Sequence, residues 1–228
     1  MSALANQVGQ SNLAERIFSE GQLGNLLGGG DARRYALVNR ALKDGSLIRL
    51  KRATYILGQR NSSESVHPFA VAQALLPGSY VSFETALAYH GWIPEAVFTT
   101  ANVSPGRKTI TYDTPSHGQF SFHPLALQEY QFLAGVAREK FGKLTAFVAQ
   151  PLRALMDLVA LRKEHWSSLD WLITGMRIDE DRLLPLKRKD FAALRSVYKH
   201  KAANDFLHSL EAAILTKKGA AKGRLADD

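Results

Sequence analysis

Apolar residues recur at helical spacing near the start of the chain and stop at short polar or glycine-rich breaks. Within residues 11–18 the apolar positions fall on one side of a predicted helix. Ser19 then provides an N-cap for a second helix, and Gln22 stands three positions later, where a capping box needs it. Consecutive glycines at 28–30 interrupt the pattern. The sequence therefore predicts two short helices before these glycines.

The next segment changes from a helical to a strand-like pattern at Gly45. Asp31 is expected to cap a third helix that runs to about Asp44, because Gly45 supplies the left-handed residue that commonly ends a helix. Two short alternating runs follow, Leu47–Leu50 and Thr54–Leu57, and they predict a β-hairpin. Three helices followed by a hairpin within about sixty residues is the order of a winged helix-turn-helix.

The third predicted helix has an apolar side and a basic side. At about 100° per residue, an apolar sector that would face the core contains Tyr35, Val38, Ala41 and Leu42. Arg34 lies near the border of this sector and is expected to extend toward a phosphate or a carboxylate. The opposite side carries Arg33, Ala36, Arg40 and Lys43. A solvated helix face and a DNA-contacting face both fit this pattern.

The predicted hairpin adds charge beside that helix. Its turn holds Lys51 and Arg52, and residues 31–52 together contain seven Lys or Arg and two Asp. A helix in the major groove reads base edges, and a basic turn beside it can hold the flanking phosphates. The pattern therefore favours binding to double-stranded DNA that weakens as salt is added. The predicted DNA contacts are Arg33, Arg34, Ala36, Asn39, Arg40, Lys43, Arg49, Lys51 and Arg52.

A polar run at 58–65, GQRNSSES, separates this segment from the rest and predicts a domain boundary near residue 60. Beyond it, a helix is predicted over 67–76, and Ser82 is expected to cap another helix that ends at Gly91. Three strand-like runs, punctuated by proline and glycine, then predict an antiparallel sheet. These runs are AVFTTANV at 96–103, KTITYD at 108–113 and QFSFHPL at 119–125.

Helical patterns return in the last third of the chain, at Pro151–Leu161 and Lys189–Thr216. From Lys217 onward the chain is too poor in large apolar residues to order itself. The expected fold class is α+β. It consists of a winged helix-turn-helix domain at 1–60, a mixed α+β domain with antiparallel strands and C-terminal helices at 61–216, and a flexible basic tail at 217–228.

Composition and charge narrow the class of protein. The chain has 46% hydrophobic residues, 22% charged residues and no cysteine, which excludes disulfide scaffolds and thiolate metal sites. It shows neither a leader pattern nor an apolar run of ~18 residues, so a cytoplasmic protein that does not enter the membrane is expected. The net charge of +8 is +4 over 1–57, −1 over 58–184 and +5 over 185–228. Two basic ends favour a polyanionic partner contacted by particular elements.

The sequence offers little catalytic chemistry. The seven histidines have no recognised metal-ligand spacing, and no phosphate-binding glycine motif or nucleophile elbow occurs. The one enzyme hypothesis is a nuclease in which Asp113 and the Glu139-Lys140 pair form an acidic metal site, but the usual acid-x-lysine spacing is absent. We therefore expect a protein without enzymatic activity, bound metal or cofactor.

A second basic cluster lies near the C-terminus, between residues 187 and 201. Three interpretations fit it: a solvated helix face, an additional contact to DNA phosphates, or a surface that engages RNA or an acidic partner. The residues of this possible second surface are Lys187, Arg188, Lys189, Arg195, Lys199 and Lys201.

Three phrases of the sequence carry a family resemblance: LIRLKRATYIL at 47–57, YVSFETALAYHGWIPEAV at 80–97 and VAQPLRALMDLVAL at 148–161. In this order they resemble the AbiEi-type antitoxins and transcriptional regulators of abortive-infection toxin–antitoxin systems. Ala53 stands where relatives often place glycine. The positions that match the family's phrases are Ser82, Ala86, Tyr89, His90, Gly91, Pro151, Ala154, Leu155 and Asp157.

The resemblance implies a DNA-binding antitoxin of two parts. The winged helix would bind inverted repeats in the promoter of its own operon, as a monomer or as a homodimer on DNA. The second domain would counter a toxin of the nucleotidyltransferase kind, with or without direct contact. The alternative from the residues alone is a winged-helix transcription factor whose second domain senses a small molecule or mediates dimerisation.

Overall fold

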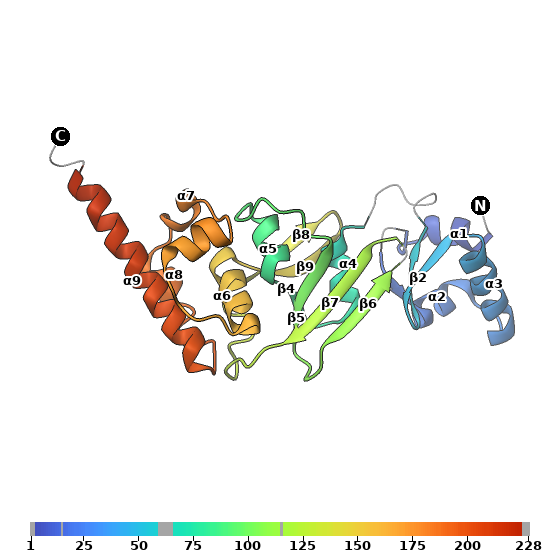
Figure 1. The fold of residues 1–228 in the computed structure, drawn as a ribbon. Helices are drawn as coiled ribbons and strands as arrows, with labels where there is room; N and C mark the ends of the chain where they lie inside the picture. Colours follow the sequence, from blue (N-terminus) through green and yellow to red (C-terminus); the bar gives the residue numbers. More distant parts are fainter. Residues whose placement is uncertain (1–2, 15, 59–65, 115, 225–228) are drawn as a thin grey trace.

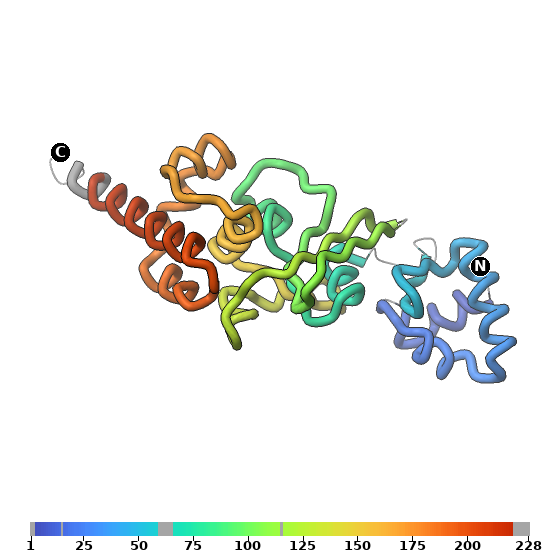
Figure 2. Tube along the Cα trace, turned by 60° about the horizontal axis from the view of Figure 1, so that its bottom comes forward, coloured from blue at the N-terminus to red at the C-terminus, as the bar shows by residue number. Residues whose placement is uncertain are grey.

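The computed structural model describes residues 3–14, 16–58, 66–114 and 116–224 and shows a mixed α+β fold. Figures 1 and 2 show an elongated molecule, with residues 3–58, here called the N-terminal unit, at one end. Residues 66–224, here called the sheet domain, form the rest, and the C-terminal helix lies at the far end. Among the described residues, no helix has the length and apolar character needed to cross a bilayer.

The N-terminal unit packs three helices against a small sheet. Its elements are α1 (Ala3–Gly9), β1 (Phe18–Ser19), α2 (Glu20–Leu27), α3 (Asp31–Lys43), β2 (Leu47–Lys51) and β3 (Thr54–Leu57). The strands pair antiparallel in the order β1-β3-β2. Leu23, Val38, Leu47 and Tyr55 contribute to one buried apolar cluster.

The local signals around α2 and the hairpin are confirmed. The Ser19 side chain accepts from the Gln22 backbone N–H and the Gln22 side chain accepts from the Ser19 N–H, which completes the capping box. Gly45 has a φ of 73° after α3. Ala53 in the hairpin turn has a φ of 57°, so the turn adopts the left-handed conformation without glycine. Asp31 is the first residue of α3, whereas Gly30 occupies the N-cap position.

The helix expected over 11–18 is wrong. The first helix is α1, and a turn follows in which the Ser11 hydroxyl donates to Val8 O at 2.8 Å and accepts from the Leu13 N–H at 3.1 Å. Phe18 pairs with Tyr55 in the sheet and is buried. The apolar residues that suggested a helical face are buried instead by a turn and a strand, because pairing with β3 overrides the local periodicity.

The sheet domain is built on six strands in the order β6-β7-β5-β4-β9-β8. The strands are β4 (Tyr80–Val81), β5 (Thr99–Ser104), β6 (Ile110–Thr114), β7 (Gly118–Pro124), β8 (Val136–Phe141) and β9 (Leu144–Ala149). The helical elements are α4 (Pro68–Leu75), α5 (Phe83–Tyr89), α6 (Pro151–Arg162), the π-helix η2 (Trp171–Gly175), α7 (Glu180–Leu183), α8 (Arg188–Ala192) and α9 (Lys201–Arg224).

This sheet is mixed, so the expected antiparallel sheet is confirmed only in part. β6 pairs antiparallel with β7 at the edge, which leaves β7 to pair parallel with β5. β4 likewise pairs parallel with β9. The β8–β9 hairpin was not predicted, although Gly142, with a φ of 59°, stands in its two-residue turn between alternating runs.

The C-terminal region differs from the expectation in its tail. Helices return there as expected, in α8 and α9, and between them Tyr198 bridges to Leu127. α9 continues to Arg224, so the tail expected to be flexible is helical over 217–224. Lys217 pairs with Glu180, and Lys218 donates to the carbonyl of Leu186. These contacts supply the ordering that apolar residues do not.

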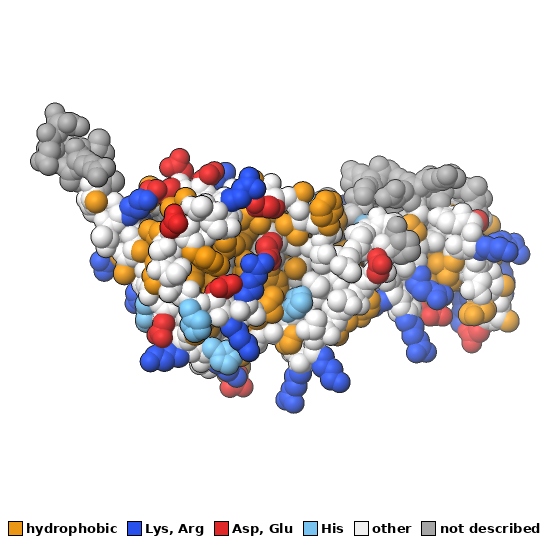
Figure 3. Space-filling model, in the orientation of Figure 1, with side chains coloured by type: hydrophobic (Ala, Val, Ile, Leu, Met, Phe, Trp, Pro, Cys, Tyr) orange, Lys and Arg blue, Asp and Glu red, His pale blue; other side chains and the backbone are white. Residues whose placement is uncertain are grey.

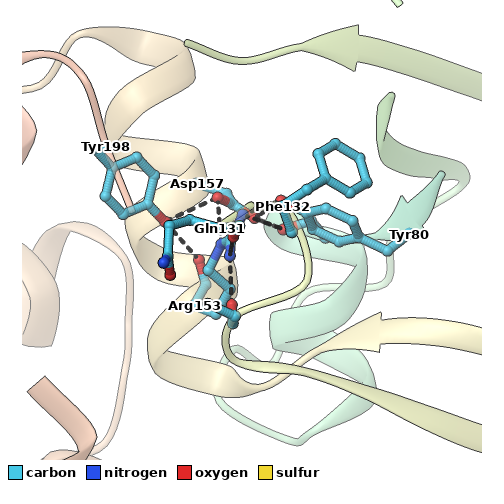
Figure 4. Close-up of polar contacts among 8 residues, drawn as sticks. Tyr80, Gln131, Phe132, Arg153, Asp157 and Tyr198 are labelled. Carbon is cyan, nitrogen blue, oxygen red and sulfur yellow. Dashed lines mark hydrogen bonds and ion pairs between the residues drawn. The ribbon is translucent and has the colours of Figure 1, made fainter. Parts of the chain in front are cut away.

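A buried ion pair joins the sheet to its helices (Figure 4). Arg153 Nε donates to Asp157 Oδ1 at 2.8 Å within α6, and both side chains have an exposed fraction of 0%. The hydroxyls of Tyr80, Ser82 and Tyr198 donate to Asp157 at 3.0, 2.7 and 2.8 Å. The Arg153 guanidinium also donates to the carbonyls of Gln131, Phe132 and Ala134. This pair connects β4, α6, the segment after β7 and the segment before α9.

The ion pair changes the role of Ser82. Ser82 occupies the N-cap position of α5, but its hydroxyl makes no capping hydrogen bond and binds Asp157 instead. Burial is the largest single effect and lowers the pKa of Arg153, but Asp157, Tyr198 and Tyr80 together outweigh it, so that the pKa is raised. Burial first, and then Asp157, raises the pKa of Tyr80 and Tyr198. Arg153 is therefore cationic, and both tyrosines keep their protons as donors.

Candidate nucleic-acid interface

α3 turns one side to the core and the other to solvent. Val38 and Ala41 are buried, and Arg34, Leu37 and Leu42 are half-buried around them. The remaining residues of the helix after Asp31 are exposed: Ala32, Arg33, Tyr35, Ala36, Asn39, Arg40 and Lys43. The expected basic side is therefore accessible, and Ala36 adds no bulk to it.

The cations of this exposed side differ in what they contact. Among the described residues, no hydrogen bond or ion pair engages the side chains of Arg33, Arg40 and Lys43. Arg34 instead pairs with Asp31 and donates to Gly29 O at 3.1 Å. Arg34 was expected to extend toward a phosphate or a carboxylate, and within the protein it reaches the carboxylate of Asp31.

Tyr35 is the residue that the sequence misplaced. It was expected in the apolar sector, but 68% of it is exposed. On a helical projection Tyr35 and Arg34 lie on opposite sides of Val38, about 60° and about 40° away. The helix is rotated so that the Arg34 side faces α2, which pushes Tyr35 outward. Tyr35 now borders a groove of about 550 Å³ between α2 and α3.

The hairpin turn does not stand beside α3 as a separate basic projection. Lys51 Nζ donates to Leu75 O, the last residue of α4, at 2.8 Å. Behind it, Leu50 and Ile56 pack in one buried cluster with residues of α4 and β7: Val71, Ala72, Leu75, Phe120 and Phe122. The hairpin thus joins the N-terminal unit to the sheet domain.

The three cations of the hairpin therefore differ in exposure: Lys51 is half-buried, whereas Arg49 and Arg52 are exposed. Lys51 is half-buried in that junction, so the expectation that its ammonium group holds DNA phosphates is corrected. The Arg49 guanidinium lies 5.8 Å from the centre of the Tyr55 ring, and its side chain is exposed. Arg52 is exposed at the turn.

The second basic cluster lies far from α3. Lys187 is the N-cap of α8, and Arg188 and Lys189 are its first two residues. Lys199 precedes α9, and Lys201 is the first residue of α9. All five are exposed, whereas Arg195 pairs with Glu211 at 2.8 Å. α8 and α9 lie at the end of the molecule opposite α3 (Figure 1), and Figure 3 shows Lys and Arg side chains over both ends. The two clusters are separate surfaces.

The acids of the nuclease hypothesis are not brought together. Asp113 is on β6 and Glu139 on β8, at opposite edges of the six-stranded sheet. Five strand spacings separate these edges by about 24 Å. Within the part of the chain that the structure describes, no group of three or more His, Asp or Glu side chains could hold a metal ion. His117 contacts the Ser116 hydroxyl at 2.7 Å, and His90 contacts Ala149 O at 2.9 Å.

Comparison with known proteins adds no relative. Neither the protein-family models nor the curated proteins contain a match to this chain.

Proposed function

We propose that the chain binds double-stranded DNA through the exposed side of α3, and that the N-terminal unit works as a winged helix-turn-helix. The observation that carries the proposal is the accessible basic side formed by Arg33, Arg40 and Lys43, none of which forms a hydrogen bond or an ion pair with another described side chain. Exposed, hydrated guanidinium and ammonium groups can exchange water and counterions for phosphates. Ala36 between them allows close approach to base edges.

The proposed role is that of a DNA-binding antitoxin. The chain would bind inverted repeats in the promoter of its own operon, repress that operon, and counter a nucleotidyltransferase-type toxin encoded beside it. The family resemblance of the phrases at 80–97 and 148–161 supports the antitoxin part, and α3 supports the DNA part. Arg49 and Arg52 would contact flanking phosphates, whereas Lys51 would not.

A salt titration tests DNA binding. The affinity for the DNA upstream of the gene is measured by fluorescence anisotropy between about 50 and about 200 mM salt. Changing Arg33, Arg40 and Lys43 together to Ala should lower affinity and reduce the slope of log K against log salt by about 2.7, because each lost phosphate contact removes about 0.9. The matched control changes Lys187, Arg188 and Lys189 to Ala. An unchanged slope in the α3 variant would show that α3 is not the DNA surface.

A growth assay tests the antitoxin role separately. The full-length chain and the α3 triple variant are each expressed with the neighbouring toxin gene. Both proteins should rescue growth, because the proposed antitoxin role belongs to the sheet domain. Only the wild type should repress its operon, because repression requires α3. Failure of the wild type to rescue growth would leave a transcription factor whose second domain has another role.

A further inference from the structure

A cavity of about 580 Å³ lies in the sheet domain, away from the basic surfaces. β7 turns Phe120 and Phe122 toward α4, and the alternating residues Ser121 and His123 belong to the opposite side of the sheet and line this cavity. The walls come from the start of α5, the loop at 93–98, the end of α6 and the end of η2. Five separate parts of the chain, β7 included, thus border one open hollow.

Two polar groups of the cavity have no partner among the described residues. No hydrogen bond engages the Ser121 hydroxyl or the His123 imidazole within the described ranges. Burial lowers the pKa of His123, and Glu84 opposes this effect only in part. The ring is therefore neutral at pH 7 and offers one donor and one acceptor. A buried hydroxyl and a half-buried imidazole without hydrogen-bond partners in the protein are suited to hydrogen-bonding a ligand.

A strained residue holds an aromatic ring beside this histidine. Phe83 is buried and has a φ of 55°, which is unfavourable for a bulky side chain. Its ring meets the His123 ring edge to face, with 5.7 Å between ring centres and 90° between planes. Backbone strain of this kind persists where the surrounding structure enforces it, and it concentrates at ligand-binding positions.

The charges around the cavity are already paired. Glu84 at the start of α5 forms an ion pair with Arg162, and Glu95 accepts from Arg177 at 3.0 Å. These pairs leave no unpaired charge for an ionic ligand among the acids and the arginine that line the cavity. The other walls are apolar and include Met176 and Phe98, whose side chain is 91% exposed at the rim. Methionine sulfur and aromatic faces pack well against an aromatic ring.

We propose that this cavity binds a neutral aromatic small molecule that hydrogen-bonds Ser121 and His123 and packs its ring between Phe83, Met176 and Phe98. The site is independent of α3, so it does not require the proposed DNA binding.

Saturation-transfer NMR on the full-length protein tests this, with phenol and indole as probes. Benzoate, benzylamine and cyclohexanol are the comparison compounds, because they change only the charge or the aromatic character. Phenol and indole should show saturable binding, and the comparison compounds should bind about tenfold or more weakly. Absence of saturable binding for both probes up to about 10 mM, which corresponds to a very weak site, would overturn the proposal.

Variants locate the binding. Ser121→Ala with His123→Ala should weaken indole or phenol binding about threefold to tenfold, as expected for lost hydrogen bonds. Phe98→Ala should weaken binding about twofold to tenfold, and its exposed position makes loss of folding improbable as an explanation. The control is Lys140→Ala on the exposed edge strand β8. Equal binding by the wild type and the Phe98→Ala and double variants would place the probes elsewhere and refute the assignment.

Discussion

The arginines of α3 and the arginine of α6 show two opposite uses of positive charge. Arg33 and Arg40 lie on an exposed helix face and form no hydrogen bond or ion pair with a described side chain. Arg153 has an exposed fraction of 0% and is held by Asp157, a tyrosine hydroxyl and backbone carbonyls. An exposed cation remains available to a polyanion, whereas a buried cation needs its partners within the fold. The position of a charge in the fold therefore indicates its role better than a basic run in the sequence.

The largest effect expected from this comparison is on stability. Arg153→Met leaves Asp157 as a buried carboxylate without its cation, which should lower the free energy of unfolding by about 3–5 kcal/mol. Arg33→Met should change it by less than about 0.5 kcal/mol, because that side chain is exposed. Urea unfolding followed by circular dichroism measures both. Similar values for the two variants would mean that the Arg153 pair does not hold the sheet domain together.

The second prediction divides the exposed face of α3 into reading and holding residues. Tyr35→Ala with Asn39→Ala should reduce discrimination between specific and random DNA by about 1–3 kcal/mol, because an amide can pair with adenine and a ring can contact a thymine methyl group. The salt slope should not change, since neither side chain is charged. In vitro selection from a random duplex library supplies the specific site. If the double variant changed the salt slope but kept its discrimination between specific and random DNA, these two residues would hold the phosphates and would not read the bases.

The third prediction separates the neighbours in the hairpin turn. Lys51→Met removes a charged donor from Leu75 O and should cost about 1.5–3 kcal/mol of stability, with little change in DNA affinity. Arg52→Ala should cost less than about 0.5 kcal/mol, and it should lower the salt slope by about 0.9 if it contacts one phosphate. Chemical unfolding and anisotropy on the same two proteins decide this. If Lys51→Met alone lowered the salt slope, the turn would face DNA and not α4.

Sequence reasoning succeeded where the cause of a structure is local. The Ser19–Gln22 capping box, the glycine after α3 and the hairpin all depend on residues within a few positions of one another. The helix at 11–18 was wrong, and the antiparallel sheet was right only in part, because strand neighbours are chosen by the complete sheet. Local periodicity contains no information on whether β7 pairs with β5 or only with β6.

The site was predicted in part for the same reason. Amphipathic spacing identified the exposed basic residues of α3 and placed Arg34 at the border of the core, but it could not fix the rotation of the helix to within one residue, so Tyr35 was wrongly placed in the apolar sector. Lys51 reads as a solvent-exposed cation until α4, which follows it in the chain, is seen to present Leu75 O to it. The cavity beside His123 combines residues from five parts of the chain, and no sequence spacing marks it.

The smallest expected effect concerns the backbone of Ala53 in the hairpin turn, a position whose conformation does not depend on charge. Ala53 adopts a φ of 57°, where a Cβ atom is unfavourable, and its carbonyl accepts from the Glu20 N–H at 3.0 Å. Ala53→Gly removes the Cβ cost but adds disorder to the unfolded chain, so a net stabilisation of about 0.5 kcal/mol is expected. Ala53→Val should instead destabilise by more than about 1 kcal/mol, since a β-branched residue resists this conformation. Thermal unfolding of the three proteins should give a melting temperature that falls in the order Gly, Ala, Val at position 53. The reverse order would show that the turn does not require a left-handed residue. The hairpin would then reach α4 through a different turn.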